Sequence, residues 1–108
     1  MTSDALPGEG TVPETTSATV LSRWLTICNK RGLHARAAAK FVALAERFGA
    51  SVEVVKDGQA VSARSIMGLM MLGAGQGARV ELRGEGWDAK EAMDALAALV
   101  EAGFNEQD

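Results

Sequence analysis

The fold of this chain is decided by the stretch "SVEVVKDGQAVSA", residues Ser51–Ala63. The run "SVEVV" is rich in valine, and the dipeptide Asp57-Gly58 that leads into "QAVSA" is typical of a tight β-hairpin turn. Two strands joined by so short a turn are antiparallel neighbours in one sheet. The stretch therefore predicts strands over Ser51–Val55 and Gln59–Ala63, and with them an antiparallel sheet.

Further elements flank this hairpin. Thr19–Ile27 carries β-branched and aromatic residues, and Ala78–Gly84 alternates apolar and polar residues, so both are predicted strands. Helical spacing of apolar residues predicts three helices, over Ala35–Phe48, over Ile66–Met71 behind a capping Ser65, and between Asp88 and Gly103. Gly49 stands where a left-handed C-terminal residue is expected. Asp88 and Glu91 together resemble a capping box.

The order of predicted elements is β-α-β-β-α-β-α. A sheet whose helices cover one face has two layers. We therefore predict an α+β fold, a two-layer open-faced sandwich of a four-stranded antiparallel sheet with three helices on one face. Residues 1–17 hold both prolines and many small polar residues, which predicts a disordered leader. The domain is expected over residues 18–104, followed by a flexible tail over residues 105–108.

Composition limits the class of protein. A length of 108 residues predicts one domain. Its single cysteine, Cys28, cannot form an internal disulfide, so nothing argues for export; we expect a small buried or half-buried side chain. No segment approaches the roughly 20 apolar residues that span a bilayer, and the N-terminus lacks a signal-peptide pattern, so a cytoplasmic location is expected. Trp24 and Trp87 are interpreted as structural.

The charges are unevenly distributed. The net charge of −3 is too small to indicate a nucleic-acid-binding protein. Between Glu14 and Glu46 there is no acidic residue, and the same interval holds the bases Arg23, Lys30, Arg31, Arg36 and Lys40. From Asp88 onward acidic residues dominate. Such asymmetry influences which surface a partner approaches, although a solvated face with random clustering would give the same pattern.

The only histidine, His34, lies in "NKRGLHAR", Asn29–Arg36. Asn29 and Gly32 favour an exposed turn, which puts His34 at or near the N-cap of the first helix. Free N–H groups and the helix dipole there favour an anion beside the imidazole, and keep more of the ring neutral. Arg36 on the same turn suits a hydrogen bond to a phosphoryl group. These features predict a histidine that accepts a phosphoryl group and passes it on.

The same residues allow or exclude other roles for His34. A plain polar helix cap without chemistry stays open as an alternative. A zinc site is not supported, because one histidine and one cysteine six residues apart fall short of four ligands. A hydrolase is not supported either, because Cys28 ends a strand rather than standing on a nucleophile turn. No metal and no cofactor is therefore expected.

The segment "ARSIMGLMML", Ala63–Leu72, is unusually apolar. Its large apolar side chains cannot all point inward from a helix of two turns, so part of this surface is expected to be exposed. Exposed methionine and isoleucine are typical of adaptable docking surfaces, although a short, over-apolar core helix is the plain alternative. A phosphate on Ser65 would put about two negative charges on this patch.

The segments "NKRGLHARAAAKF" (Asn29–Phe41) and "RSIMGLMMLGAGQG" (Arg64–Gly77) resemble the two signature segments of the HPr family, the histidine-containing phosphocarriers of the bacterial phosphotransferase system. The resemblance covers about residues 19–104, and the two motifs stand at the family's spacing from each other. It implies an HPr-like fold, whose order of elements is the order predicted above. It also implies a phosphoryl carrier rather than a stand-alone enzyme.

The resemblance assigns roles to individual residues. It implies that His34 is phosphorylated on Nδ1, and that Arg36 neutralises the phosphoryl group. Ser65 resembles the regulatory serine that a dedicated kinase phosphorylates in many members. The implied docking surface comprises Ala35, Lys40, Arg64, Ile66, Met67 and Met70. Where the family often has proline, this chain has Ala37, which is more similar to the nitrogen-related branch than to the sugar-transport members.

The implied partners are an enzyme I type phosphoryl donor, an enzyme IIA type acceptor, and an HPr serine kinase/phosphorylase with regulatory proteins. A monomer without nucleic-acid binding or membrane insertion is expected. Two other hypotheses remain open. One is a non-catalytic binding module of the same fold that docks partners through Ile66–Met70. The other is a small-molecule sensor that uses the glycine-rich run at residues 73–77 as a ligand loop.

Overall fold

The computed structural model describes residues 19–106. Its elements are β1 (Leu21–Thr26), α1 (Ala35–Ala45), β2 (Ser51–Lys56), β3 (Gln59–Ser62), α2 (Ile66–Met71), β4 (Arg79–Glu85), α3 (Ala89–Glu101) and a short 3-10 turn, η2 (Gly103–Asn105). This order confirms the predicted β-α-β-β-α-β-α succession. The leader predicted over residues 1–17 lies outside the described residues.

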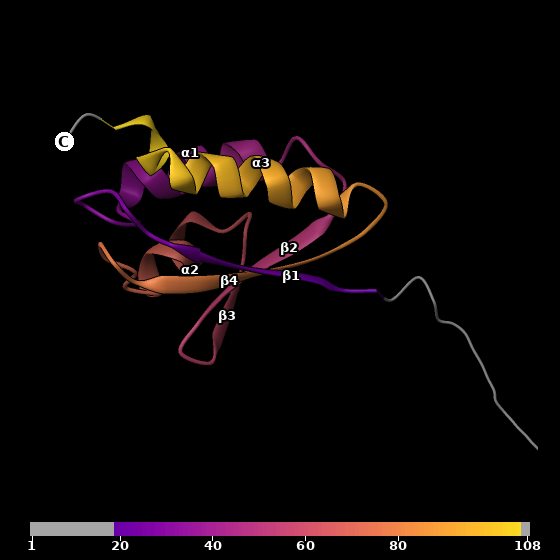
Figure 1. Cartoon of the computed structure of the whole chain (residues 1–108), viewed down its shortest axis with the longest axis horizontal. Helices are drawn as coiled ribbons and strands as arrows, with labels where there is room; N and C mark the ends of the chain where they lie inside the picture. The colour runs from indigo at the N-terminus through magenta and orange to yellow at the C-terminus, as the bar shows by residue number, and fades with distance from the viewer. Residues whose placement is uncertain (1–18, 107–108) are drawn as a thin grey trace, which may run out of the picture.

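The four strands form one antiparallel sheet in the order β1-β4-β2-β3. Asp57 (φ 51°) and Gly58 (φ 81°) turn the chain between β2 and β3, in the left-handed conformations that a two-residue type I′ hairpin requires. Helices α1 and α3 lie side by side over one face of the sheet, and α2 packs against α1 and β3 (Figure 1). The predicted α+β sandwich is confirmed.

The core lies between the sheet and the helices. Along β4 the side chains alternate, and Val80 and Leu82 are buried at 1% and 0% exposure. The helices contribute apolar stripes with helical spacing, among them Phe41 of α1 and Leu96 of α3. Phe104 of η2 is also fully buried, so the chain continues to pack against the core beyond α3.

The first helix ends earlier than predicted. Helix α1 stops at Ala45 rather than Phe48, because the next residues tighten into i→i+3 bonds, with Phe48 N–H donating to the Ala45 carbonyl at 3.2 Å. Gly49 does not have a positive φ, so the expected left-handed C-terminal residue is wrong. A Cβ on Gly49 would lie 2.8 Å from Nε1 of the exposed Trp87 side chain, which would have to move to make room for it.

The predicted capping box at α3 is not formed. Asp88 is the N-cap residue, but its side chain makes no bond to the helix backbone. Its Oδ2 instead accepts a hydrogen bond from Gly49 N–H at 2.9 Å. The carboxylate thus ties the loop before α3 to the loop after α1.

Three side chains expected to be buried or structural are exposed. Trp24 is 55% exposed and Trp87 is 89% exposed. Trp24 lies on the sheet face that the helices leave open, with the Arg79 guanidinium 5.1 Å from the centre of its ring. Cys28 is also exposed, with its thiol 3.4 Å from the Val100 carbonyl oxygen.

The loop between β1 and α1 is braced by the glycine-rich run at residues 73–77. Leu33 N–H donates to the Ala74 carbonyl at 2.9 Å, and Gly77 N–H donates to the Ile27 carbonyl at 2.7 Å. Gly32 has a φ of +66°, and a Cβ there would lie only 2.4 Å from the Ala74 carbonyl oxygen. The loop can therefore approach this run so closely only with glycine at position 32.

We predict that Gly32→Ala lowers the free energy of unfolding by about 3 kcal/mol, because backbone strain and a steric clash add together. Gly58→Ala is the matched control: φ is again positive, but nothing lies within 4 Å of its added Cβ. We expect it to cost only about 1 kcal/mol. Denaturant unfolding followed by circular dichroism measures both losses. Equal losses would show that the close approach to Ala74 does not contribute to the free energy of unfolding.

Candidate functional site

His34 forms the N-cap of α1, as predicted. Its backbone is extended (φ −76°, ψ 178°), and its carbonyl accepts the first helical hydrogen bond from Ala38 N–H at 2.8 Å. The N–H groups of the three residues before Ala38 therefore have no acceptor within the helix. The imidazole makes no capping bond to these groups. The ring therefore does not act as a polar cap of the helix.

Asn29 organises the turn that leads to His34. It is 3% exposed, and its Nδ2 donates to the Gly32 carbonyl at 2.9 Å. Gln76 adds a second link, because its amide donates to the Cys28 carbonyl at 3.2 Å. The turn is therefore held from inside by Asn29 and from outside by the glycine-rich run, which acts as a brace for the loop.

The imidazole is held by a carboxylate that the sequence analysis missed. Nε2 of His34 is in hydrogen-bond contact with Oε2 of Glu106, and Asn29 Nδ2 donates to Oε1 of the same carboxylate at 3.0 Å. These two contacts, the one with Asn29 first, lower the pKa of Glu106 below the usual range. The sequence predicted that Glu106 lies in a flexible tail. The one signal against this was the apolar Phe104, two residues earlier, which indicates that the chain still packs against the core after α3.

The two basic residues predicted near His34 behave differently. Lys40, one turn further along α1, donates from Nζ to the Phe104 carbonyl at 2.7 Å and so holds η2. Arg36 is exposed, as is Ala35. Within residues 19–106, the Arg36 side chain has no hydrogen bond or ion pair, which leaves its guanidinium available to an incoming anion.

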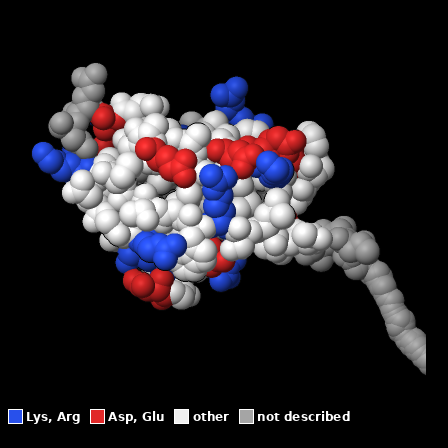
Figure 2. All heavy atoms as spheres, viewed as in Figure 1, with Lys and Arg blue, Asp and Glu red and all other residues white. Residues whose placement is uncertain are grey.

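Arg23 belongs to the basic interval of the sequence but not to the site. Its guanidinium pairs with Asp94 of α3 at 2.9 Å and approaches Glu101 at 3.8 Å. Lys90 pairs with the same Asp94 at 2.8 Å, and these contacts, the one with Lys90 first, lower the pKa of Asp94. Figure 2 shows the resulting surface, where acidic side chains gather along α3 with basic ones between them.

Ser65 caps α2 as predicted. Its backbone is extended, and its Oγ accepts a hydrogen bond from Gly68 N–H at 2.9 Å. The side chain is partly exposed at the start of the helix. The hydroxyl is therefore accessible at the edge of the apolar patch that follows it.

Helix α2 presents the apolar surface expected from its sequence. Leu69 is fully buried, whereas other side chains on the helix are exposed, at 40% for Ile66, 69% for Met67, 41% for Met70 and 69% for Met71. Figure 1 shows α2 at the same end of the molecule as the loop between β1 and α1. The patch formed by these four residues, called the α2 patch below, thus lies at the His34 end of the fold. Met71 is an addition to the residues predicted.

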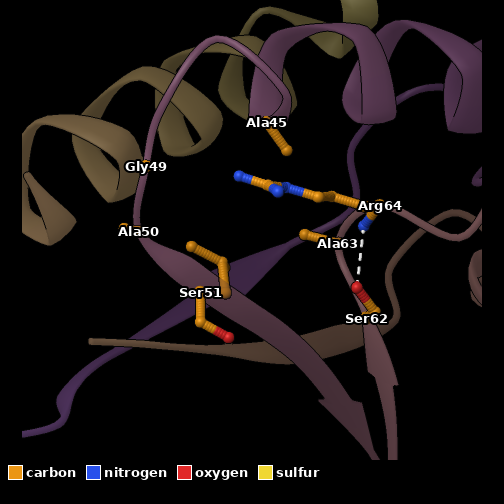
Figure 3. Close-up of a pocket in the computed structure, with 8 residues that line it drawn as sticks. Ala45, Gly49, Ala50, Ser51, Ser62, Ala63 and Arg64 are labelled. Atoms are coloured by element: carbon orange, nitrogen blue, oxygen red, sulfur yellow. Dashed lines mark hydrogen bonds between the residues drawn. The ribbon is translucent and has the colours of Figure 1, made fainter. Parts of the chain in front are cut away.

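Arg64 lies away from this end. Its guanidinium donates to the Phe48 carbonyl at 2.5 Å, near the C-terminal end of α1. There it extends across a pocket whose lining includes Ala45, Gly49 and Ser51 (Figure 3). The structure therefore does not bring the Arg64 head group together with His34.

Among residues 19–106 there is no group of three or more histidine, cysteine, aspartate or glutamate side chains that could hold a metal ion. Within the same residues, no helix is both long enough and apolar enough to cross a membrane.

Comparison with known proteins agrees with this geometry. The sequence model of a family described as "PTS HPr component phosphorylation site" matches residues 21–102. The phosphocarrier protein NPr of Shewanella violacea is 50% identical over 88 residues, which cover 82% of this chain and 97% of that protein. The phosphocarrier protein HPr of Cupriavidus necator is 52% identical over 87 residues, covering 81% of this chain and 98% of that protein.

Solved structures agree as well. The crystal structure of HPr-C-His from Thermoanaerobacter tengcongensis has a TM-score of 0.77 and 47% sequence identity, and covers 81% of this chain and 98% of that one. The fold, the family match and the full-length relatives point the same way. The chain belongs to the HPr family and is a phosphocarrier component of the phosphotransferase system.

Proposed function

We propose that His34 is the residue that carries the phosphoryl group, accepting it on Nδ1 from an enzyme I type protein and passing it to an enzyme IIA type acceptor. The observation that supports this most is the orientation of the ring, whose Nε2 is engaged by Glu106. Within residues 19–106, Nδ1 has no hydrogen-bond partner, so its lone pair is available.

The chemistry is a direct exchange of one N–P bond for another. The Nδ1 lone pair attacks phosphorus, the N–P bond of the donor phosphohistidine breaks, and its electron pair returns to the donor imidazole. The positive N-terminus of α1 and the exposed Arg36 guanidinium offset the charge on the phosphoryl oxygens. Transfer to the acceptor repeats the same exchange in the opposite sense.

Partners dock, in this proposal, on the α2 patch together with Ala35 and Lys40 beside His34. Exposed methionines can repack against different surfaces, which suits one surface used in turn by a donor and an acceptor. Arg64 was predicted to belong to this surface, but its side chain is directed to Phe48. We therefore assign it a smaller share in docking. The carrier acts as a monomer in the cytoplasm.

Ser65 is proposed as the regulatory site, phosphorylated by an HPr kinase/phosphorylase type enzyme. Its hydroxyl is partly exposed beside Ile66 and Met67. A phosphate there adds about two negative charges to the edge of an otherwise apolar patch. Docking of a partner on that patch would then require desolvation of the added charge.

The pathway is proposed from the sequence around Ala37, which favours the nitrogen-related branch. The relatives named NPr and HPr are nearly equal in identity, at 50% and 52%. The donor that phosphorylates the chain fastest identifies the branch, so enzyme I proteins of both branches belong in the experiment.

We predict that His34→Ala abolishes phosphorylation without unfolding the protein. Intact mass is measured after incubation with phosphoenolpyruvate, Mg²⁺ and enzyme I, before and after mild acid. The wild type is expected to gain one acid-labile phosphoryl group, and Ser65→Ala, which retains the histidine, to gain it as well. An acid-labile phosphate on folded His34→Ala would refute the assignment. A folded wild type without added mass would favour a binding module instead.

We also predict that Ser65→Asp slows transfer on the order of 10-fold, because a charge at the edge of the α2 patch opposes docking. Gln59→Glu is the matched control, since it adds one charge on the hairpin at the start of β3. Initial rates of phosphoryl transfer from enzyme I measure both variants. Equal rates for Ser65→Asp, Gln59→Glu and the wild type would remove Ser65 as a regulatory site.

A further inference from the structure

The contact between His34 and Glu106 is shielded from solvent. The side chains of the two residues are only 17% and 11% exposed. A carboxylate and an imidazole held together in this way restrict the rotation of the ring. They also influence which ring nitrogen carries the proton.

Several contacts place the Glu106 carboxylate where it is. Phe104 is fully buried and anchors the segment, although its φ of 57° is strained. Lys40 Nζ binds the Phe104 carbonyl at 2.7 Å, and Glu106 N–H donates to the Gly103 carbonyl at 3.1 Å. Asn29 then holds Oε1, so that Oε2 is directed to His34. The position of the carboxylate is thus set by a core side chain, a lysine and an asparagine.

The position of the proton follows from these contacts. A glutamate is ionised near neutral pH, and the Asn29 hydrogen bond first and then His34 lower the pKa of Glu106 further, so the carboxylate stays ionised in this contact. An ionised carboxylate only accepts hydrogen bonds, so the hydrogen in the contact belongs to Nε2. In the neutral ring this leaves the lone pair on Nδ1.

We propose that Glu106 is a positioning residue for phosphoryl transfer, which keeps the proton on Nε2 and offsets the positive charge that the ring gains when Nδ1 bonds to phosphorus. The inference rests on the proposed function of His34. In the forward step, the N–P bond forms at Nδ1 while Nε2 retains its hydrogen, and the ring becomes cationic. The Glu106 carboxylate faces that cation directly, as the carboxylate does in a carboxylate–imidazole pair of a hydrolase.

The same proton serves the return step. When the N–P bond breaks, its electron pair stays on Nδ1, and the departing ring is neutral imidazole because Nε2 still carries its hydrogen. Without that hydrogen the leaving group would be an imidazolate anion, which is a much poorer one. Glu106 is therefore expected to affect both receipt and delivery of the phosphoryl group.

Glu106→Gln tests the proposal with nearly the same shape. Its amide oxygen can still accept from Asn29, but its NH₂ then faces Nε2 and donates to it. This forces the proton onto Nδ1 and removes the nucleophilic lone pair. We expect the rate of transfer from phosphorylated enzyme I to fall by roughly 10-fold or more, the scale found when the carboxylate partner of a metal-binding imidazole is lost.

Because His34 is the only histidine, its ring nitrogens can be observed directly by ¹⁵N NMR of the untagged protein. The wild type is expected to show a protonated Nε2 and an unprotonated Nδ1. Glu106→Gln is expected to shift the proton toward Nδ1. A rate that falls while both nitrogens keep their wild-type signals would mean that Glu106 acts on docking, and would overturn the proposal.

Two further variants sharpen the test. Glu106→Ala removes the carboxylate without supplying a donor, so its loss of rate should be smaller than that of Glu106→Gln. The reverse order would overturn the proposal. Glu101→Gln removes a carboxylate at the end of α3 that contacts Arg23 rather than His34, and is expected to transfer at the wild-type rate.

The outcome for the wild type separates the two proposals. A wild type that acquires no phosphoryl group in this assay contradicts the role of His34 itself. A wild type that is phosphorylated, together with a folded Glu106→Gln that reacts equally fast, contradicts only the role of Glu106. Amide ¹H–¹⁵N spectra of each variant verify the fold.

Discussion

The close backbone contact between Gly32 and the glycine-rich run is the constraint on which the functional end of the molecule depends. Leu33 can bond to Ala74 only because no side chain at position 32 separates the two segments. This contact sets the direction in which the chain enters α1, and so puts His34 at the N-cap. The run begins where α2 ends, which brings the α2 patch to the same end. A loop held in this way suits group transfer that needs little reorganisation.

The second support of the site comes from the end of the chain. Burial of Phe104 contributes about 1.5–3 kcal/mol, which offsets the cost of about 1–2 kcal/mol for its left-handed backbone. The buried side chain keeps η2 against α1, where Lys40 also binds it. Glu106 follows shortly after. His34, which comes after the first strand, therefore contacts a carboxylate from the other end of the domain's sequence.

Covering the sheet on one face only explains which apolar side chains remain exposed. Trp24 lies on the open face, beside Arg79, far from the helix layer. The exposed methionines have another origin, because α2 is too short to bury more than Leu69. The two exposed surfaces therefore differ in their position relative to His34. Of the two, the α2 patch belongs to the helix that lies at the same end of the molecule as the loop between β1 and α1, which leads to His34 (Figure 1).

The sequence by itself determined the features that depend on neighbours a few residues apart. These include the Asp57-Gly58 hairpin, the order of strands and helices, the N-cap positions of His34 and Ser65, and the surplus of apolar residues on α2. These turns, caps and helical faces involve residues within about four positions, so a linear pattern could predict them. The two segments that resemble the HPr signature are also local patterns, so the function could be predicted from them as well.

Only the tertiary structure decided the contacts between distant residues. Glu106 meets His34 across 72 positions and Asn29 across 77, and Asp88 turns from its own helix to Gly49 across 39. No local pattern distinguishes a carboxylate that caps its helix from one that bonds a remote loop, because the choice depends on how the packed elements bring the loops together. For that reason the histidine could be found in the sequence, whereas the carboxylate that orients it became visible only in the fold.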